Sequence, residues 1–151
     1  MGIYILSQIC YNERMSIGSF LKNWLYRRRL KKYGLQFPIY CKAHGVKHLD
    51  RQGASAQSRT GDRLQLVHGP LPDYPHNVYV YSISLNRILG YLDETLSIKL
   101  VFVFGKGFCR DGIIEAITGG EPYQYFGCNV KLLDTREFCK DETDFSALRG
   151  E

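Results

Sequence analysis

Three consecutive pieces of sequence decide the fold: LQLVHGP at residues 64–70, DYPHNVYVY at residues 73–81 and ILGYL at residues 88–92. The first two pieces are rich in β-branched and aromatic residues, which favour strands. Three prolines between residues 69 and 76 restrict the backbone of the turn that connects them. This pattern predicts strands over 63–68 and 77–84, and a short third strand over 88–92.

The order of these pieces resembles the HIRAN family, in which a hydrophobic strand leads into an N-P-Y-D-x-N-A-I segment and then into a strand that ends in G-Y/H-L. Tyr74 and Asn77 match the tyrosine and the asparagine of that segment. Gly90-Tyr91-Leu92 matches the strand end, and Gly45-Val46-Lys47-His48 matches the family's G-V/L-basic-aromatic corner. The resemblance covers residues 37–133. It implies a compact β-barrel related to the OB and SH3-like types.

The same resemblance implies a nucleic-acid-binding module of DNA repair and no enzyme activity. Family members bind the 3′-hydroxyl end of single-stranded DNA with stacking aromatics, a carboxylate on the terminal hydroxyl and basic groups on phosphates. Here Pro75 stands where the family commonly has Asp. We therefore expect binding of single-stranded or damaged DNA, and Pro75 puts specificity for the 3′ end in doubt. The expected binding residues are Lys47, His48, Arg51, Arg63, Tyr74, Asn77 and Tyr91.

Composition agrees with a nucleic-acid ligand but does not require one. The chain of 151 residues carries a formal charge of +5 and contains 11 Tyr and 8 Phe. Residues 14–49 hold nine basic side chains and no acidic one, and such a region attracts phosphate. Stacking of a base on an aromatic ring contributes about 1–3 kcal/mol. The plainer interpretation is a solvated basic helix face and tyrosines that are half-buried in the barrel.

Residues 16–33 are expected to form a basic amphipathic helix, because five apolar residues recur at the spacing of one helix face. They are Ile17, Phe20, Leu21, Trp24 and Leu25. Ser16 suits an N-cap and Gly34 suits a helix stop. We expect this face to pack on the chain's own domain. A basic helix with a tryptophan also suits nucleic acid or an anionic membrane surface, and these alternatives stay open.

The rest of the chain predicts short strands, one helix and two loose segments. Strands are expected over 37–41 (an edge strand, because of Pro38), 108–117 and 126–133, and a helix over 93–104 with Asp93 as its N-cap. Residues 50–61 are expected to be a mobile loop, and the tail from residue 137 to be loose. The predicted fold is mainly β, a small OB/SH3-like barrel of five to six strands with one crossing helix. The predicted segments are an extension over 1–35, a barrel domain over 36–134 and a charged tail over 135–151.

The five cysteines give no motif for metal or nucleophilic chemistry. They are Cys10, Cys41, Cys109, Cys128 and Cys139. No pair has C-x-x-C spacing, so we expect reduced and mostly buried thiols in a cytoplasmic protein, with Cys139 the most exposed. No catalytic constellation, metal site or cofactor is expected.

Single-stranded DNA is the partner that we expect first. Two alternatives remain at this point. One is a protein-interaction module that partners a repair or restriction protein such as a nuclease or helicase. The other is peripheral association with an anionic membrane through residues 16–33. No apolar run approaches the roughly 18 residues that a membrane span needs.

Overall fold

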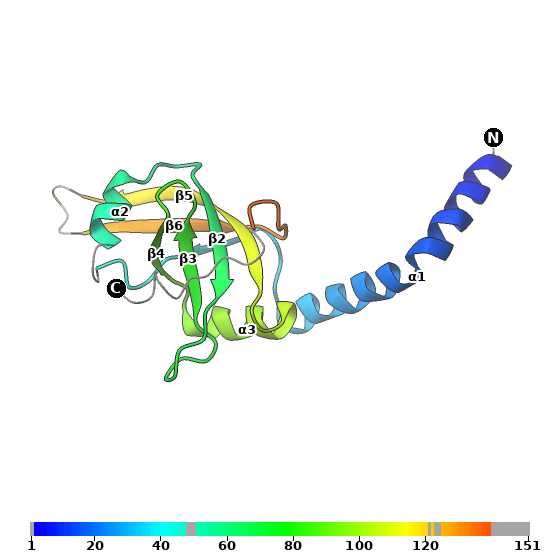
Figure 1. Cartoon of the computed structure of the whole chain (residues 1–151), viewed down its shortest axis with the longest axis horizontal. Helices are drawn as coiled ribbons and strands as arrows, with labels where there is room; N and C mark the ends of the chain where they lie inside the picture. Colours follow the sequence, from blue (N-terminus) through cyan, green and yellow to red (C-terminus); the bar gives the residue numbers. More distant parts are fainter. Residues whose placement is uncertain (1, 48–50, 121, 123–124, 140–151) are drawn as a thin grey trace. The chain divides into compact units, whose positions relative to one another are not determined.

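The computed structural model describes residues 2–47, 51–120, 122 and 125–139, with side chains from residue 17 onward (Figure 1). The chain divides into two compact units, residues 1–36 and residues 37–151. Each unit is described by itself below. The first contains a helix, and the second contains the six strands found among the described residues.

Helix α1 runs over Gly2–Lys32 and is longer than the predicted 16–33. Ser16 therefore lies inside the helix, and its prediction as the N-cap is wrong. No proline occurs before residue 38, so nothing in the sequence interrupts the helix earlier. The predicted stop at Gly34 is confirmed: Gly34 has φ +68°, and the Leu35 N–H donates to the Leu30 carbonyl at 2.9 Å. None of the described helices is long and apolar enough to cross a membrane.

Six antiparallel strands form one curled sheet, which confirms a mainly β, barrel-like fold (Figure 1). The strands are β1 (Ile39–Lys42), β2 (Arg63–His68), β3 (Val78–Ser82), β4 (Arg87–Tyr91), β5 (Cys109–Gly119) and β6 (Phe126–Leu132). Their order in the sheet is β1-β6-β5-β2-β3-β4. The two edges meet just after β1, where His44 and Tyr91 exchange backbone hydrogen bonds of 2.7 and 2.9 Å.

The central strands β2 and β3 are buried on both faces. Leu64, Leu66, Val78 and Val80 are fully buried on one side, together with residues of β4, β5 and β6. On the other side Val67, Tyr79, Tyr81 and Ile88 form a second apolar cluster, against which Ile83 and Cys109 pack. Continuous burial explains why 64–67 and 78–81 read as unbroken β-rich runs rather than as strict alternation.

Helix α3 spans Glu94–Phe104, as the sequence predicts. The Asp93 carboxylate caps its first turn by accepting from the Leu96 N–H at 3.1 Å. Gly105 ends the helix with φ +92°. Its buried residues include Leu100 and Val101, so α3 covers part of the core. The helix passes across one end of the sheet (Figure 1).

Residues 51–57 form helix α2 (Arg51–Gln57), so the predicted mobile loop over 50–61 is wrong for this segment. The sequence shows no apolar periodicity there, but Ala54 and Ser55 are buried. The helix packs against β4 and β6. The helical conformation of residues 51–57 thus depends on the burial of these two small residues against the sheet, and the local sequence pattern does not predict it.

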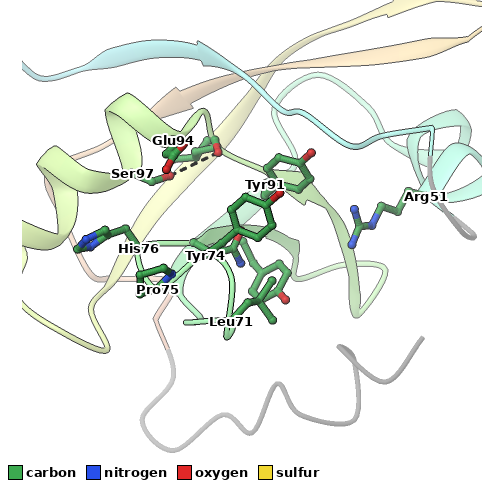
Figure 2. A pocket seen from close by; sticks show the side chains of 11 residues that line it. Arg51, Leu71, Tyr74, Pro75, His76, Tyr91, Glu94 and Ser97 are labelled. Atoms are coloured by element: carbon green, nitrogen blue, oxygen red, sulfur yellow. Dashed lines mark hydrogen bonds between the residues drawn. The ribbon is translucent and has the colours of Figure 1, made fainter.

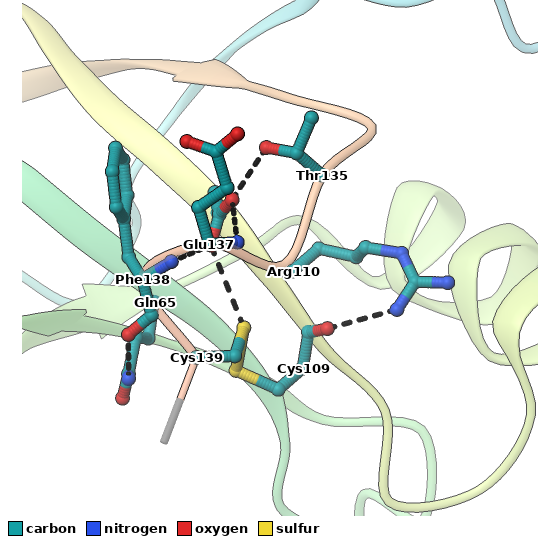
Figure 3. The surroundings of a disulfide bond; sticks show 8 residues. Gln65, Cys109, Arg110, Thr135, Glu137, Phe138 and Cys139 are labelled. Atoms are coloured by element: carbon teal, nitrogen blue, oxygen red, sulfur yellow. Dashed lines mark hydrogen bonds between the residues drawn. A yellow bond between two sulfur atoms is a disulfide. The ribbon is translucent and has the colours of Figure 1, made fainter. Parts of the chain in front are cut away.

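Cys109 and Cys139 are joined by a disulfide with a Cα–Cα distance of 6.0 Å, so the prediction of reduced thiols is wrong for this pair (Figure 3). The fully buried Asp111 carboxylate accepts from the backbone N–H groups of Glu137 and Phe138 at 2.5 and 2.7 Å, and from the Thr135 hydroxyl. Residues 137–139 are therefore not loose. The predicted loose tail beyond residue 139 lies outside the described residues.

Cys41 and Cys128 are free thiols. Burial is the main cause that raises the pKa of Cys41 to about 12, and burial also raises the pKa of Cys128 to about 11. Both thiols are therefore protonated near neutral pH and are poor nucleophiles. The Cys10 side chain lies outside the described ones.

Candidate nucleic-acid interface

The loop over residues 69–77 carries Tyr74 away from the sheet. The base of the loop is closed by the Gly69 N–H, which donates to the Asn77 carbonyl at 2.9 Å, and by the Asn77 side-chain amide, which donates to the Gly69 carbonyl at 3.1 Å. Near the tip, Leu71 and Tyr74 exchange backbone hydrogen bonds of 3.0 and 3.1 Å. The Tyr74 side chain is 59% exposed, as expected for an aromatic residue between prolines.

Tyr91 lies at the point where the edges of the sheet meet. Gly45 has φ +69°, and a methyl group on it would overlap with the Tyr91 ring, so only glycine leaves room for this ring. A methyl group on Gly90 would overlap with the His44 carbonyl that bonds to Tyr91. The structure therefore explains why glycine precedes tyrosine in the Gly90-Tyr91 motif. Gly90 lets the two edges of the sheet approach each other, and this closure positions Tyr91.

A cavity of about 340 Å³ lies between the loop, β4 and the starts of α2 and α3 (Figure 2). It brings together four of the predicted binding residues: Arg51, Tyr74, Asn77 and Tyr91. The rings of Tyr74 and Tyr91 border the opening, and Arg51 reaches toward it from α2 (Figure 2). Arg51 Nη1 donates to the Gly45 carbonyl at 3.1 Å, which fixes the guanidinium beside the Tyr91 ring.

The remaining predicted residues lie elsewhere. Lys47 borders a neighbouring groove rather than the cavity. Arg63 begins β2, at the end of the strand opposite the loop, and its guanidinium carbon lies 4.9 Å from the centre of the Phe138 ring. The structure does not bring Arg63 together with the other predicted residues. His48 lies outside the described residues.

A second, more open groove of about 470 Å³ begins on the other side of Tyr91, which borders both hollows. Its other lining residues include Lys42, His44, Lys47 and Tyr125, and all four side chains are exposed. Lys47 Nζ lies 4.6 Å from the centre of the Tyr125 ring. No carboxylate is among the described residues that line this groove.

The sequence analysis missed three residues of the site: Gln52, His68 and Glu94. The Gln52 amide donates to the Val46 carbonyl at 2.7 Å and accepts from the Phe126 N–H at 2.9 Å, so it joins two walls of the groove. His68 holds the loop through the Pro75 carbonyl at 2.8 Å. Glu94 places an exposed carboxylate at the rim of the cavity.

Only one of these three residues had a signal in the sequence. Glu94 follows Tyr91 by three positions, next to the predicted N-cap Asp93, so its place near Tyr91 could have been inferred. The Gln52 amide contacts Phe126 across 74 positions of sequence, and His68 contacts Pro75 across 7 and Gly107 across 39; no local pattern reveals these contacts.

The described residues hold no group of three or more His, Cys, Asp or Glu side chains that could bind a metal ion. No protein-family model matches the chain. Searches of curated proteins and of solved structures also found no significant match.

Proposed function

We propose that this protein is a non-catalytic nucleic-acid-binding module of the HIRAN type, whose barrel domain binds single-stranded or damaged DNA at the Tyr74–Tyr91 cavity. The observation that carries the proposal is the pairing of two exposed tyrosine rings, 59% and 37% exposed, around one cavity with an arginine at its edge. Exposed aromatic faces and adjacent cations are what a single strand needs for base stacking and phosphate contacts.

The distribution of charge supports a strand that extends beyond the cavity. Glu94 disfavours a phosphate inside the cavity, whereas the groove beyond Tyr91 offers Lys42 and Lys47, and its described lining residues include no carboxylate. A base or sugar in the cavity and phosphates along the groove therefore match the charges on both sides of Tyr91. The volume of the cavity, about 340 Å³, lies within the range of roughly 300–1,000 Å³ that is usual for ligand sites.

The test is a titration of labelled oligothymidylate, followed by fluorescence anisotropy at low salt. We expect Tyr74→Ala to weaken binding by about 5- to 150-fold, which corresponds to the loss of one stacked base. Tyr74→Phe keeps the ring and should retain most of the affinity.

Tyr40→Ala is the matched control, because Tyr40 is 62% exposed and borders neither the cavity nor the groove beside it. Equal losses for Tyr74→Ala and Tyr40→Ala would count against the cavity. Absence of binding by the unmodified protein would reject the function.

Helix α1 favours a second candidate function, peripheral binding to an anionic membrane. Ile17, Phe20 and Trp24 are 59%, 69% and 48% exposed, and the last turn carries Arg29, Lys31 and Lys32. Apolar side chains beside cations suit the headgroup region of an anionic bilayer. Co-sedimentation with phosphatidylserine vesicles should then decrease for Phe20→Ser combined with Trp24→Ser, while binding of oligothymidylate stays unchanged.

A further inference from the structure

Phe102 belongs to a small set of exposed aromatic side chains on the barrel unit. Among the described residues from 37 to 139, five large hydrophobic side chains are between 37% and 62% exposed, and all five are aromatic. They are Tyr40, Tyr74, Tyr91, Phe102 and Tyr125. Tyr74 and Tyr91 border the cavity, and Tyr91 and Tyr125 border the groove. A single exposed aromatic residue is ordinary, but three of these five gather at one candidate site.

The ring of Phe102 lies next to a residue that lines the cavity. Its centre is 5.8 Å from the centre of the His76 ring, with an angle of 42° between the planes, and His76 lines the cavity. Figure 2 shows His76 and Arg51 at opposite ends of the cavity. The groove begins at the Arg51 end, because Arg51 Nη1 contacts the carbonyl of Gly45, which lines the groove. Groove, cavity and Phe102 therefore follow one another in this order.

A cation accompanies Phe102 on helix α3. Lys99 precedes Phe102 by three positions, and side chains three positions apart are neighbours on the surface of a helix. The acidic residue of α3 is Glu94, which lies at the other end of the helix, and the acidic residue of the loop over 69–77 is Asp73. A phosphate beyond His76 is therefore expected beside Lys99.

We infer that Phe102 is a further stacking site of the proposed interface, and that a single strand continues from the groove through the cavity and past His76 onto α3. This inference rests on the proposed function. One base stacks on the exposed part of the Phe102 ring, and a phosphate lies beside Lys99. Ring and cation repeat the combination that Tyr125 and Lys47 form in the groove.

The ligand is then an internal stretch of single-stranded nucleic acid, with nucleotides on both sides of the cavity. Its bound length is on the order of 4 nucleotides or more, which is the lower end of the range for one barrel of the OB type. The affinity of the unmodified protein should therefore rise as an oligothymidylate is lengthened from two nucleotides to about this size. Phe102→Ala should reduce that rise.

The experiment measures the Kd of the full chain for a labelled oligothymidylate of about 12 nucleotides, by fluorescence anisotropy at several salt concentrations. We expect Phe102→Ala to weaken binding by about 5- to 150-fold, as for the loss of one stacked base. Phe102→Tyr keeps the ring and should retain most of the affinity. Phe102→Leu keeps an apolar side chain without a ring and should weaken binding nearly as much as Phe102→Ala.

The dependence of Kd on salt separates the base contact from the phosphate contact. Lys99→Gln should reduce the slope of log Kd against log salt concentration by about 0.7, because one phosphate of the single strand is no longer neutralised. Phe102→Ala should leave this slope unchanged, since the ring carries no charge.

Tyr40 and Lys131 are the matched control pair. Lys131 Nζ lies 6.0 Å from the centre of the exposed Tyr40 ring, and neither residue borders the cavity or the groove. Tyr40→Ala should leave the Kd unchanged, and Lys131→Gln should leave the salt slope unchanged.

A double-mutant cycle distinguishes stacking on Phe102 from an effect that passes through His76. If Phe102 contacts the base itself, Phe102→Ala should weaken binding by a similar factor in the unmodified protein and in His76→Ala. A loss that vanishes in the His76→Ala background would mean that Phe102 only positions His76, and it would overturn the inference. Chemical denaturation verifies that each variant is folded, and Phe102→Leu takes the place of Phe102→Ala in the cycle if the latter is not.

The outcomes separate this inference from the proposed function. Binding that Tyr74→Ala weakens but Phe102→Ala leaves unchanged would overturn the Phe102 site and retain the function. Equal losses for Phe102→Ala and Tyr40→Ala, or full affinity in Phe102→Leu, would also overturn the site. Absence of binding by the unmodified protein would reject the proposed function and this site together.

Discussion

Gly45 shows how one residue without a side chain positions the candidate site. Its φ of +69° is accessible to glycine with little strain, and its Cα faces the ring of Tyr91 and the guanidinium of Arg51. Both side chains border the cavity. The glycine of the G-V-K motif thus sets the distance between the backbone and the two side chains that we expect to contact a ligand.

At this residue scale we predict that Gly45→Ala will lower the free energy of unfolding by about 1 kcal/mol or more and will weaken oligonucleotide binding several-fold. The methyl group would both strain the backbone and displace the Tyr91 ring. Chemical denaturation and fluorescence anisotropy measure the two effects.

Gly53→Ala is the control for this substitution, because Gly53 lies in α2, where an added methyl group would meet no described atom within 4 Å apart from the nearby backbone of the helix itself. It should leave binding unchanged and stabilise the protein by up to about 1 kcal/mol. Normal affinity for Gly45→Ala would show that the position of Tyr91 is unimportant for binding.

At the scale of elements, the short helix α2 contributes side chains to both the cavity and the groove walls. This helix of 7 residues supplies Arg51 to the cavity and Gln52 to the walls of the groove. The Gln52 amide pairs with both the N–H and the C=O of Phe126, much as a neighbouring strand would. The helix therefore fastens the start of β6 to the loop after β1.

We predict that Gln52→Ala will destabilise the protein by about 1–3 kcal/mol, because it leaves half-buried backbone groups of Val46 and Phe126 without this partner. Chemical denaturation gives the free energy of unfolding. Gln57→Ala, at the exposed end of the same helix, should change it by less than about 0.5 kcal/mol. Equal effects of the two substitutions would mean that α2 contributes only through its helical conformation.

At the scale of the whole molecule, the last described segment is tied to the barrel by a disulfide and by several hydrogen bonds. The disulfide joins Cys139 to β5, and the buried Asp111 carboxylate binds the backbone of the residues just before it (Figure 3). The Gln65 amide also donates to the Phe138 carbonyl. The segment thus covers polar groups of β2 and β5 that would otherwise be buried without partners.

We predict that a reducing agent will lower the free energy of unfolding by about 2–4 kcal/mol, since the disulfide closes a loop across 30 positions of sequence. Cys139→Ser should show a similar loss and should no longer respond to the reductant. Alkylation of the unfolded chain followed by mass spectrometry should label three of the five cysteines without reduction and all five after it. Five labelled cysteines without reduction would contradict the pairing.

Local sequence patterns correctly predicted the strands, helix ends and turns that are set by residues close together in the chain. The β-rich run before Gly69 predicted β2 with its observed bounds, and Asp93 and Gly105 predicted the limits of α3. Prolines between residues 69 and 76 predicted a turn, and the turn exposes Tyr74. These features follow from backbone preferences and caps, which act over a few residues.

Only the tertiary structure decided which of these parts meet. Four features depend on contacts that no local sequence pattern indicates. They are the bonds between His44 and Tyr91, the helix at 51–57, the pairing of Cys109 with Cys139 and the bond between His68 and Pro75. The sequence by itself determined a mainly β chain with an exposed tyrosine in a proline-rich turn. Closure of the sheet decided that Tyr91 and Arg51 face that tyrosine, because long-range packing and backbone hydrogen bonds select among the arrangements that local preferences allow.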